Sequence, residues 1–421
     1  MADTDAENGI EASFMDPAVQ DDPFATYAEM HERCPVYRLP ETGLVMVTKY
    51  DDVRTVMTDS SVFSSQPSGG AGRQTDIVKA HADYIATHGW VKARTLQRTD
   101  PPVHTRYRKL LGRVFTNRRV KDMAPRIDEI THMLVDQFID RGNCEWVSEM
   151  ALPLPGIFIA EQLGLEASQI DVFKRWADAM LAMSQRVLTL DEALQAAATE
   201  VEAQQFMAKE FEKRRANPTD DLISALVHAH GEDEEPFTME ELQDLMHQLI
   251  TGGFETTTAA LSTGMWLLLR YPDQQQAIRN DPSLISNFIE ESLRFDSPVA
   301  GLWRVAACPT SIRGVDIEAG QPVMARYAAA NRDADQFQDP DRFDIMRSNA
   351  TSHVAFGVGN HFCIGAALAR QELLSVFQAV VARMDDLALA EPLDEQPHEF
   401  SFFLRPMKQL QLSFRAKGGP P

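Results

Sequence analysis

The amino-acid sequence predicts a mainly helical protein with small β-sheets, because segments with helical periodicity dominate the 421-residue chain and only short stretches resemble strands. The longest periodic segment runs from residue 238 to residue 270 and would form about 48 Å of helix. Residues 121–230 are expected to form several further amphipathic helices. No Gly/Ser-rich or Pro-rich linker interrupts the middle of the chain, which predicts one large domain over residues 21–421 behind a disordered acidic leader at residues 1–20.

The N-terminal part of the chain is expected to contain a short helix followed by a β-hairpin. The helix should open at residues 22–23, and residues 36–39 should pair with residues 44–48 across a turn. Residues 63–98 show no sustained periodicity. This segment is therefore expected to be irregular, either a recognition segment or a plain surface loop.

The C-terminal third is expected to mix strands with one long helix. Residues 312–327 should form strands, and the helix that follows Cys363 should continue to about Met384. Residues 410–414 should form a short closing strand. The strands predict small sheets beside the helical body.

The composition restricts the partners and the compartment of the protein. A net charge of −22 disfavours nucleic acid and anionic membranes as partners, because both would be repelled. Residues 1–20 include acidic side chains, no basic one and no apolar run, so neither a signal peptide nor a membrane anchor is expected. We expect a soluble, cytoplasmic monomer. No disulfide is expected from the four scattered cysteines, Cys34, Cys144, Cys308 and Cys363.

A glycine-rich loop, Phe356 to Gly365, carries one cysteine into an apolar helix. Gly357 and Gly359 permit backbone conformations that are closed to residues with a Cβ, and they let a flat, bulky ligand approach the main chain. Cys363 stands at the helix N-terminus, where unpaired N–H groups and the helix dipole favour a thiolate. The position suits a sulfur that ligates a metal.

Three simpler interpretations of this loop remain open from the residues alone. Cys363 could be a small buried hydrophobic side chain, as single cysteines in helical proteins usually are. The two glycines and Asn360 could mark only a turn. Cys363, His361 and His353 could bind zinc, although no second ligand pair lies at the spacing of a structural zinc site.

The long periodic segment is interrupted at residues 251–258, where two glycines, an acid and the three hydroxyl residues Thr256 to Thr258 stand in the helix interior. Each glycine costs about 1 kcal/mol relative to alanine in that position. Close packing against another helix would explain Gly252 and Gly253. Alternatively, the two glycines let the helix lie against a flat cofactor, while the Thr256 hydroxyl competes for a backbone carbonyl and opens a groove.

A second candidate site lies on the helix that Pro101 and Pro102 start and that continues to about Phe115. His104 and Arg108 are four residues apart, so they share one face and can converge on a single anion. A basic, solvated helix face is the alternative explanation.

A third pair, Glu291 and Arg294, lies on a predicted helix at residues 287–294. The two residues are three apart and can form an ion pair. An exposed pair of this kind would contribute about 0 to 1 kcal/mol, and the motif alone is weak.

The loop Phe356 to Gly365 matches, at every fixed position, the pattern Phe-Gly-x-Gly-x-His-x-Cys-x-Gly of the haem-ligand loop of the cytochrome P450 family. Four other sites match the family in the same order: His104 with Arg108, Gly252 to Thr256, Glu291 with Arg294, and Arg342. The chain thus resembles a soluble bacterial member over nearly its whole length. The resemblance implies a single triangular-prism haem-thiolate monooxygenase fold, in which Arg342 joins Glu291 and Arg294 in a structural ion network.

The resemblance also implies one haem b and assigns roles to the matching residues. Cys363 would be the proximal thiolate ligand of the iron. Thr256 and Glu255 would take part in proton delivery during O₂ activation. The other cofactor-binding positions would be His104, Arg108, Arg304 and His361 for the propionates, and Phe356, Gly357, Gly365, Gly252 and Gly253 around the ring.

The resemblance further implies a hydrophobic substrate of small or medium size, such as a terpenoid, steroid or aromatic compound, that is hydroxylated or epoxidised. Electrons would come from NAD(P)H through a ferredoxin reductase and a ferredoxin that docks near Arg108, Lys109 and Arg113. The candidate substrate positions, each of which could equally be ordinary core, are Ile85, Trp90, Leu96, Leu249, Gly253, Val299, Leu302, Trp303 and Phe402.

Two other functions compete with this interpretation. A peroxygenase would use H₂O₂ directly and would have less need of Glu255 and Thr256. A haem sensor or ligand-binding protein would show no turnover. Turnover with peroxide but with no ferredoxin would identify the first, and absence of product in a reconstituted system would identify the second.

Overall fold

The computed structural model describes residues 10, 13–14, 16–40, 42–66, 76–165, 169–185, 188–231, 235–392, 397–399 and 401–417. Much of the predicted leader and residues 67–75 of the irregular segment lie outside these ranges. The chain divides into two compact units, which are described separately below. Unit 1 comprises residues 1–71, 131–151 and 256–421, and unit 2 comprises residues 72–130 and 152–255. The single domain expected over residues 21–421 stays a prediction.

Unit 1 contains a five-stranded sheet with the order β1-β2-β8-β5-β3. Its strands are β1 Val36–Arg38, β2 Val45–Val47, β3 Phe63–Ser64, β5 Leu302–Ala306 and β8 Pro322–Ala325. The predicted hairpin is confirmed, because β1 pairs antiparallel with β2 and Val36 lies opposite Val47. Strand β2 also pairs in parallel with β8, so it lies inside the sheet and all three of its residues are buried.

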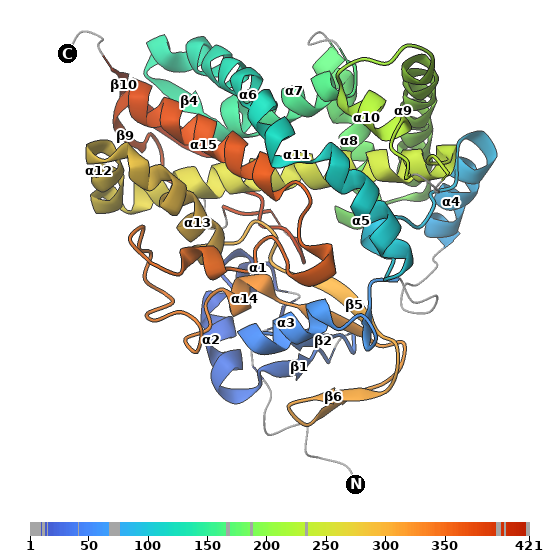
Figure 1. The fold of residues 1–421 in the computed structure, drawn as a ribbon. Coiled ribbons are helices and arrows are strands. Elements are labelled where there is room, and N and C mark those ends of the chain that lie inside the picture. Colours follow the sequence, from blue (N-terminus) through green and yellow to red (C-terminus); the bar gives the residue numbers. More distant parts are fainter. Residues whose placement is uncertain are drawn as a thin grey trace. The chain divides into compact units, whose positions relative to one another are not determined.

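The two faces of this sheet contact different core clusters, as the two-residue period of a strand requires. Val45 and Val47 of β2 pack with the helices α3 Tyr50–Thr58 and α14 Tyr327–Ala330. Met46 points to the other face and packs with α2 Phe24–Arg33. Figure 1 shows α3 and α14 beside the strands of this sheet.

The remaining elements of unit 1 are smaller sheets and four helices. A three-stranded sheet has the order β4-β10-β9, and β6 pairs with β7. Strand β10 confirms the predicted closing strand. The bounds are β4 Asn143–Glu145, β6 Thr310–Ile312, β7 Val315–Ile317, β9 Met384–Leu389, β10 Gln411–Ala416, α1 Pro17–Asp21, α12 Pro272–Asn280, α13 Ile285–Phe295 and α15 Ala366–Arg383.

Unit 2 is helical. Its helices are α4 Asp76–His88, α5 Val103–Val114, α7 Pro153–Gln162, α8 Ile170–Gln185, α9 Leu190–Ala216 and α10 Leu222–Val227, with a short 3₁₀ turn, η1, at Leu96–Arg98. Helix α4 corrects the expectation of an irregular segment at residues 63–98. Its own pattern is weak, but Ile85 packs against Ala197 and Val201 of α9, so tertiary contacts stabilise it.

Two helices contribute residues to both units, α6 Asn117–Phe138 and α11 Met239–Arg270. Helix α11 confirms the longest predicted segment and runs for 32 residues through both glycines, as the yellow ribbon in Figure 1 shows. A capping box starts it: the Thr238 N–H donates to Glu241 Oε2 at 2.9 Å, and the Glu241 N–H donates to Thr238 Oγ1 at 3.2 Å. In the described parts of the chain, no helix combines the length and the apolar character that crossing a membrane requires.

Candidate functional site

The glycine-rich loop in unit 1 presents the Cys363 thiol to its surroundings. Gly357 and Gly359 have φ values of 70° and 68°, in the left-handed region that favours glycine. A Cβ on Gly359 would also lie 2.9 Å from Thr58 Cγ2. The Cys363 N–H donates to the Phe356 carbonyl at 2.8 Å and closes the loop, and α15 begins three residues later. Cys363 is exposed, so the interpretation as a buried hydrophobic side chain does not hold.

An ion cluster formed by Glu290, Arg370 and His353 supports this loop. Glu290 of α13 accepts hydrogen bonds from Arg370 Nε at 2.6 Å and Nη2 at 2.8 Å, and its Oε2 lies 3.2 Å from His353 Nε2. Burial opposes ionisation of Glu290, but the hydrogen bonds from Arg370 and His353 lower its pKa to about 2. The Arg370 guanidinium also lies 4.5 Å from the ring centroid of Phe356. His353, to which the sequence assigned no clear role, therefore supports the loop.

Two predicted anion-binding side chains lie in the same unit as the thiol. His361 Nε2 is 2.9 Å from Ser65 Oγ. Arg304 of β5 is buried, and its Nη1 donates to the Trp303 carbonyl at 2.8 Å. Burial raises the pKa of Tyr327. The charge of Arg304 lowers this pKa and that of Cys363 raises it, so the phenol lies near both groups. The Tyr327 hydroxyl also lies 3.4 Å from the position of a Cβ on Gly357.

Four predicted substrate positions, Val299, Leu302, Trp303 and Phe402, lie in unit 1. Trp303 stacks on Phe402 with ring centroids 6.0 Å apart and planes 16° apart. Leu302 and Trp303 are nevertheless 38% and 42% exposed, which is high for large apolar side chains. A bridge between Val299 and Leu404 joins the two segments that carry these residues. Leu302 and Trp303 are neighbours on β5, so they point to opposite faces of the sheet, with Leu302 opposite Ala325 and Trp303 opposite Met324. Val299 packs with the cluster that contains Ala325 and Phe402 with the cluster that contains Met324, so the four positions do not form one surface.

The predicted ion network is wrong in one member: Arg347, not Arg342, completes it. Glu291 and Arg294 are fully buried and pair at 2.7 Å, as their spacing predicts. Arg347 Nε donates to Glu291 Oε1 at 3.1 Å. Only the backbone carbonyl of Arg342 takes part, accepting from Arg294 Nη2 at 3.3 Å, while its side chain is 69% exposed. The two arginines belong to one irregular loop, and sequence spacing does not show which of them turns inward.

Replacing Arg347 with methionine is expected to lower the free energy of unfolding by about 2–4 kcal/mol, because Glu291 loses a buried cationic partner. The Arg347 side chain also donates to the carbonyls of Gln338 at 2.6 Å and Asp339 at 3.0 Å, and these bonds would be lost. The matched Arg342→Met variant should change stability by no more than about 0.5 kcal/mol. Urea unfolding of both variants measures the difference, and equal effects would contradict the assignment.

A buried carboxyl links α15 to α11 beside the predicted catalytic threonine. Glu372 is buried, and its Oε2 accepts a hydrogen bond from Thr257 Oγ1 at 3.4 Å. Its Oε1 has no hydrogen-bond partner in the described parts of the chain. Burial raises the pKa of Glu372 to about 8, more than the Thr257 hydroxyl lowers it. The Glu372 carboxyl is therefore mostly protonated at neutral pH.

The Glu372→Gln variant is expected to depend less on pH than the native protein. The folded-state pKa of Glu372 lies above its unfolded value, so between pH 4.5 and 8 the folded state binds more protons and raising the pH lowers stability. The native protein should lose up to about 3 kcal/mol between pH 5.5 and pH 8 through this group, and the glutamine variant should not. Urea unfolding at both pH values tests this, and parallel pH profiles would contradict it.

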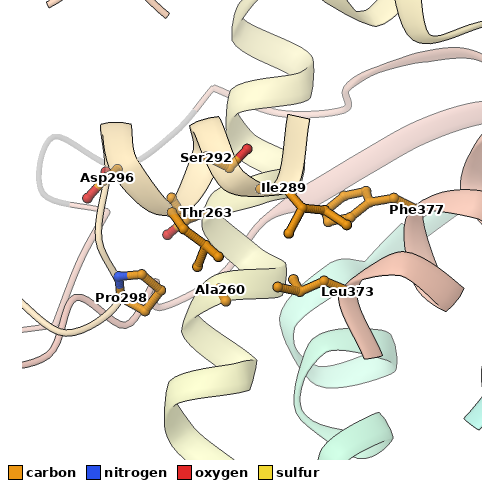
Figure 2. A pocket seen from close by; sticks show the side chains of 10 residues that line it. Ala260, Thr263, Ile289, Ser292, Asp296, Pro298, Leu373 and Phe377 are labelled. Carbon is orange, nitrogen blue, oxygen red and sulfur yellow. The ribbon is translucent and has the colours of Figure 1, made fainter. Parts of the chain in front are cut away.

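Behind the loop, α11, α13 and α15 pack around a small cavity (Figure 2). Ala260 and Thr263 of α11, Ile289 of α13 and Leu373 of α15 line it. A Cβ on Gly264 would lie 2.6 Å from Phe377 Cζ, so this glycine is explained by close helix packing alone. Thr263, Ser292 and Asp296 join a mainly apolar lining, and the cavity lies within the packed core of these helices.

Unit 2 places His104 and Arg108 on the inner side of α5. His104 is 2% exposed and Arg108 is half-buried, so a fully solvated basic face does not describe them. Glu241 of α11 holds this helix, because it accepts from Arg106 Nη1 at 2.8 Å and from the Tyr107 hydroxyl at 2.7 Å. The helix that carries the predicted propionate ligands is thus anchored to the helix that carries the glycines.

The two glycines of α11 have different surroundings in unit 2. A Cβ on Gly253 would lie 2.9 Å from Ile159 Cδ1, so close packing against α7 requires this glycine. A Cβ on Gly252 would have Gln97 Nε2 as its nearest neighbour, at 4.0 Å. Close helix packing therefore explains Gly253 and leaves Gly252 unexplained. Glu255 follows on the same helix.

The remaining predicted substrate positions in unit 2 do not form one group. Ile85 is buried against α9 and belongs to the core. Trp90 and Leu96 lie on the segment between α4 and α5, and Leu249 lies on α11. Asp244 and Gln248 are buried polar residues of α11 that bind this segment. They could not be predicted, because long-range hydrogen bonds leave no local pattern.

Comparison with known proteins identifies the family. The cytochrome P450 family model matches residues 166–414. Cytochrome P450 107B1 of Saccharopolyspora erythraea is 37% identical over 94% of this chain and 96% of its own, and the vitamin D(3) 25-hydroxylase of Pseudonocardia autotrophica is 36% identical over 93% of each. The structure of CYP109Q5 from Chondromyces apiculatus superposes with a TM-score of 0.85 at 32% identity, covering 96% of this chain and 98% of the other. The chain therefore belongs to the cytochrome P450 family and is a monooxygenase.

Proposed function

We propose that this monooxygenase holds haem b through the Cys363 thiolate and inserts one atom of O₂ into a hydrophobic organic substrate by hydroxylation or epoxidation. The observation that carries the proposal is the exposed thiol at the end of a glycine loop whose backbone only glycine readily adopts. When bound, the haem supplies the redox chemistry that activates O₂, and thiolate ligation favours cleavage of the O–O bond.

The surroundings of the thiol fit this cofactor. Phe362, beside Cys363, is 40% exposed, and a flat apolar ring would cover such a side chain. The buried Arg304 guanidinium and the His361 imidazole suit carboxylates, because both donate hydrogen bonds to anionic oxygens. Zinc is not favoured, since no group of three ligating side chains is found among the described residues.

The chain's own residues then have distinct tasks. Cys363 would ligate the iron, while His104, Arg108, Arg304 and His361 would bind the propionates and orient the ring. Phe356, Gly357 and Gly365 would shape the loop around the thiolate, and Gly252 would leave room for the ring. Gly253 serves packing. Glu255 and Thr256 hold and deliver protons, a step that must be controlled because excess water would release peroxide.

Val299, Leu302, Trp303 and Phe402 stay the proposed substrate positions of unit 1. Relatives are named for vitamin D(3) and steroid oxidation, which supports a mainly apolar substrate. Electrons are proposed to come from NAD(P)H through a ferredoxin reductase and a ferredoxin. The exposed Lys109 and Arg113, near Arg108, would give an acidic ferredoxin a basic docking surface on α5.

The reduced protein with CO tests the proposal directly. Thiolate ligation should give the red-shifted Soret band of this family, whereas a band typical of histidine-ligated haem in fresh protein would overturn the assignment of Cys363. Turnover with H₂O₂ but with no ferredoxin would instead identify a peroxygenase.

A further inference from the structure

A basic segment of unit 2 departs from the acidic character of the chain. Residues 89–98 contain Lys92, Arg94 and Arg98 and no acidic residue, in a protein with 62 acidic and 40 basic side chains. The segment follows α4 and ends in the 3₁₀ turn η1. Local positive charge of this kind attracts an anion in spite of the overall net charge.

Buried hydrogen bonds hold this segment in place at both ends. The Trp90 N–H donates to Gln204 Oε1 at 2.9 Å, and Gln204 Nε2 donates to the Trp90 carbonyl at 3.0 Å. The Thr95 N–H donates to Asp244 Oδ2 at 3.1 Å, and Asp244 is fully buried. The Gln97 N–H donates to Gln248 Oε1 at 3.1 Å. Such a segment is preorganised, so a ligand would not have to order it on binding.

The cations of the segment differ in their partners. Lys92 Nζ lies 2.8 Å from Glu200 Oε2, and His81 Nε2 lies 3.2 Å from the other carboxylate oxygen. Arg98 is half-buried, yet its side chain makes no hydrogen bond or ion pair with another described residue. Arg94 is also unpaired within the described ranges, but it is exposed. A half-buried guanidinium without an anion is uncommon, because buried charges are normally paired.

The positive charges of Arg98 and Lys92 both lower the pKa of His247 of α11. This histidine lines a small cavity together with Lys92 and Glu200, and its Nδ1 has no hydrogen-bond partner in the described parts of the chain. Burial and the charges of Lys92 and Arg98 outweigh Glu200 and lower the pKa of His247 to about 3. The imidazole is therefore neutral. Of the two cations that lower this pKa, Lys92 is paired with Glu200, whereas Arg98 has no carboxylate partner among the described residues.

We propose that Arg98, supported by His247, binds the carboxylate of an amphipathic substrate whose apolar body extends from this cluster. The inference rests on the proposed function and specifies its substrate class. The guanidinium fork matches a carboxylate with two parallel hydrogen bonds, and the ligand would supply the anionic partner that Arg98 lacks. Gln97, next in the chain, lies beside Gly252 of α11, so the segment that carries the cation also adjoins the proposed haem-facing glycine.

The test compares ligands that differ only in the headgroup. Dodecanoic acid, its methyl ester and dodecyl phosphate are titrated into the holoenzyme, with calorimetry and the haem spectral shift as independent readouts. The native protein should bind the acid at least about tenfold more tightly than the ester. Arg98→Met should remove this preference and leave ester binding unchanged. Arg94→Met makes the same charge change on the same segment and should keep the preference.

Other results of these titrations would contradict the proposal. Equal binding of acid and ester by the native protein, or equal loss of both in Arg98→Met, overturns the proposal, and tighter binding of the phosphate overturns the carboxylate assignment. Unchanged thermal unfolding of Arg98→Met shows that the variant folds. A missing thiolate band with CO would end the proposed function, while the headgroup preference would still be measured by calorimetry.

Discussion

The Cys363→Ser variant is expected to lose the red-shifted Soret band of its reduced CO complex and all monooxygenase activity. A serine hydroxyl stays protonated at neutral pH and does not supply the anionic sulfur that cleavage of the O–O bond requires. The loop itself should persist, because the backbone hydrogen bond from residue 363 to the Phe356 carbonyl does not involve the side chain. The CO difference spectrum and product analysis measure both effects.

Cys308→Ser provides the matched control. Cys308 is also an exposed, free cysteine, and it lies between β5 and β6. This variant should keep the native CO spectrum and native turnover. If it lost the thiolate band while Cys363→Ser retained it, Cys363 would not be the iron ligand.

The Thr256→Ala variant is expected to separate electron consumption from product formation. Substrate binding should be retained, because the substitution removes only one hydroxyl and one methyl group from α11. Product formation should fall by about 10²-fold, a typical loss when controlled proton transfer fails, and NAD(P)H consumption should yield peroxide instead. Peroxide and product are measured per NAD(P)H oxidised, with any ligand that gives the haem spectral shift.

Thr258→Ala controls for loss of a threonine from the same helix and should remain coupled. Native coupling in Thr256→Ala would remove Thr256 from proton delivery. Equal uncoupling in both variants would point to a general disturbance of α11.

Local patterns predicted those parts of the fold that local interactions determine. The hairpin and the 32-residue α11 with its capping box follow from alternation, helical period and cap residues within a few positions. Helix α4 could not be predicted in this way, because its stability depends on α9, more than 100 residues away in the chain. Propensity is weak information where tertiary packing decides the outcome.

The same distinction applies to the candidate site. The thiol loop is contiguous, so ten adjacent residues identified it. The choice of Arg347 over Arg342 depends on which way a loop turns, and the difference between Gly252 and Gly253 depends on Ile159 of another helix. Neither is encoded in local spacing. The support that His353 gives to the loop likewise requires Glu290, 63 residues earlier in the chain.

The parallel pairing of β2 with β8 affects the order in which the protein can assemble during synthesis. Val47 meets Ala325, so the hairpin must wait for 278 further residues before its sheet partner exists. At ribosomal rates of about 5–20 residues per second, this delay is about 14–56 s. Strand β2 has three apolar residues that are buried in the final sheet, and they stay uncovered by β8 for that time. The nascent N-terminal hairpin therefore exposes apolar side chains until the sheet is complete.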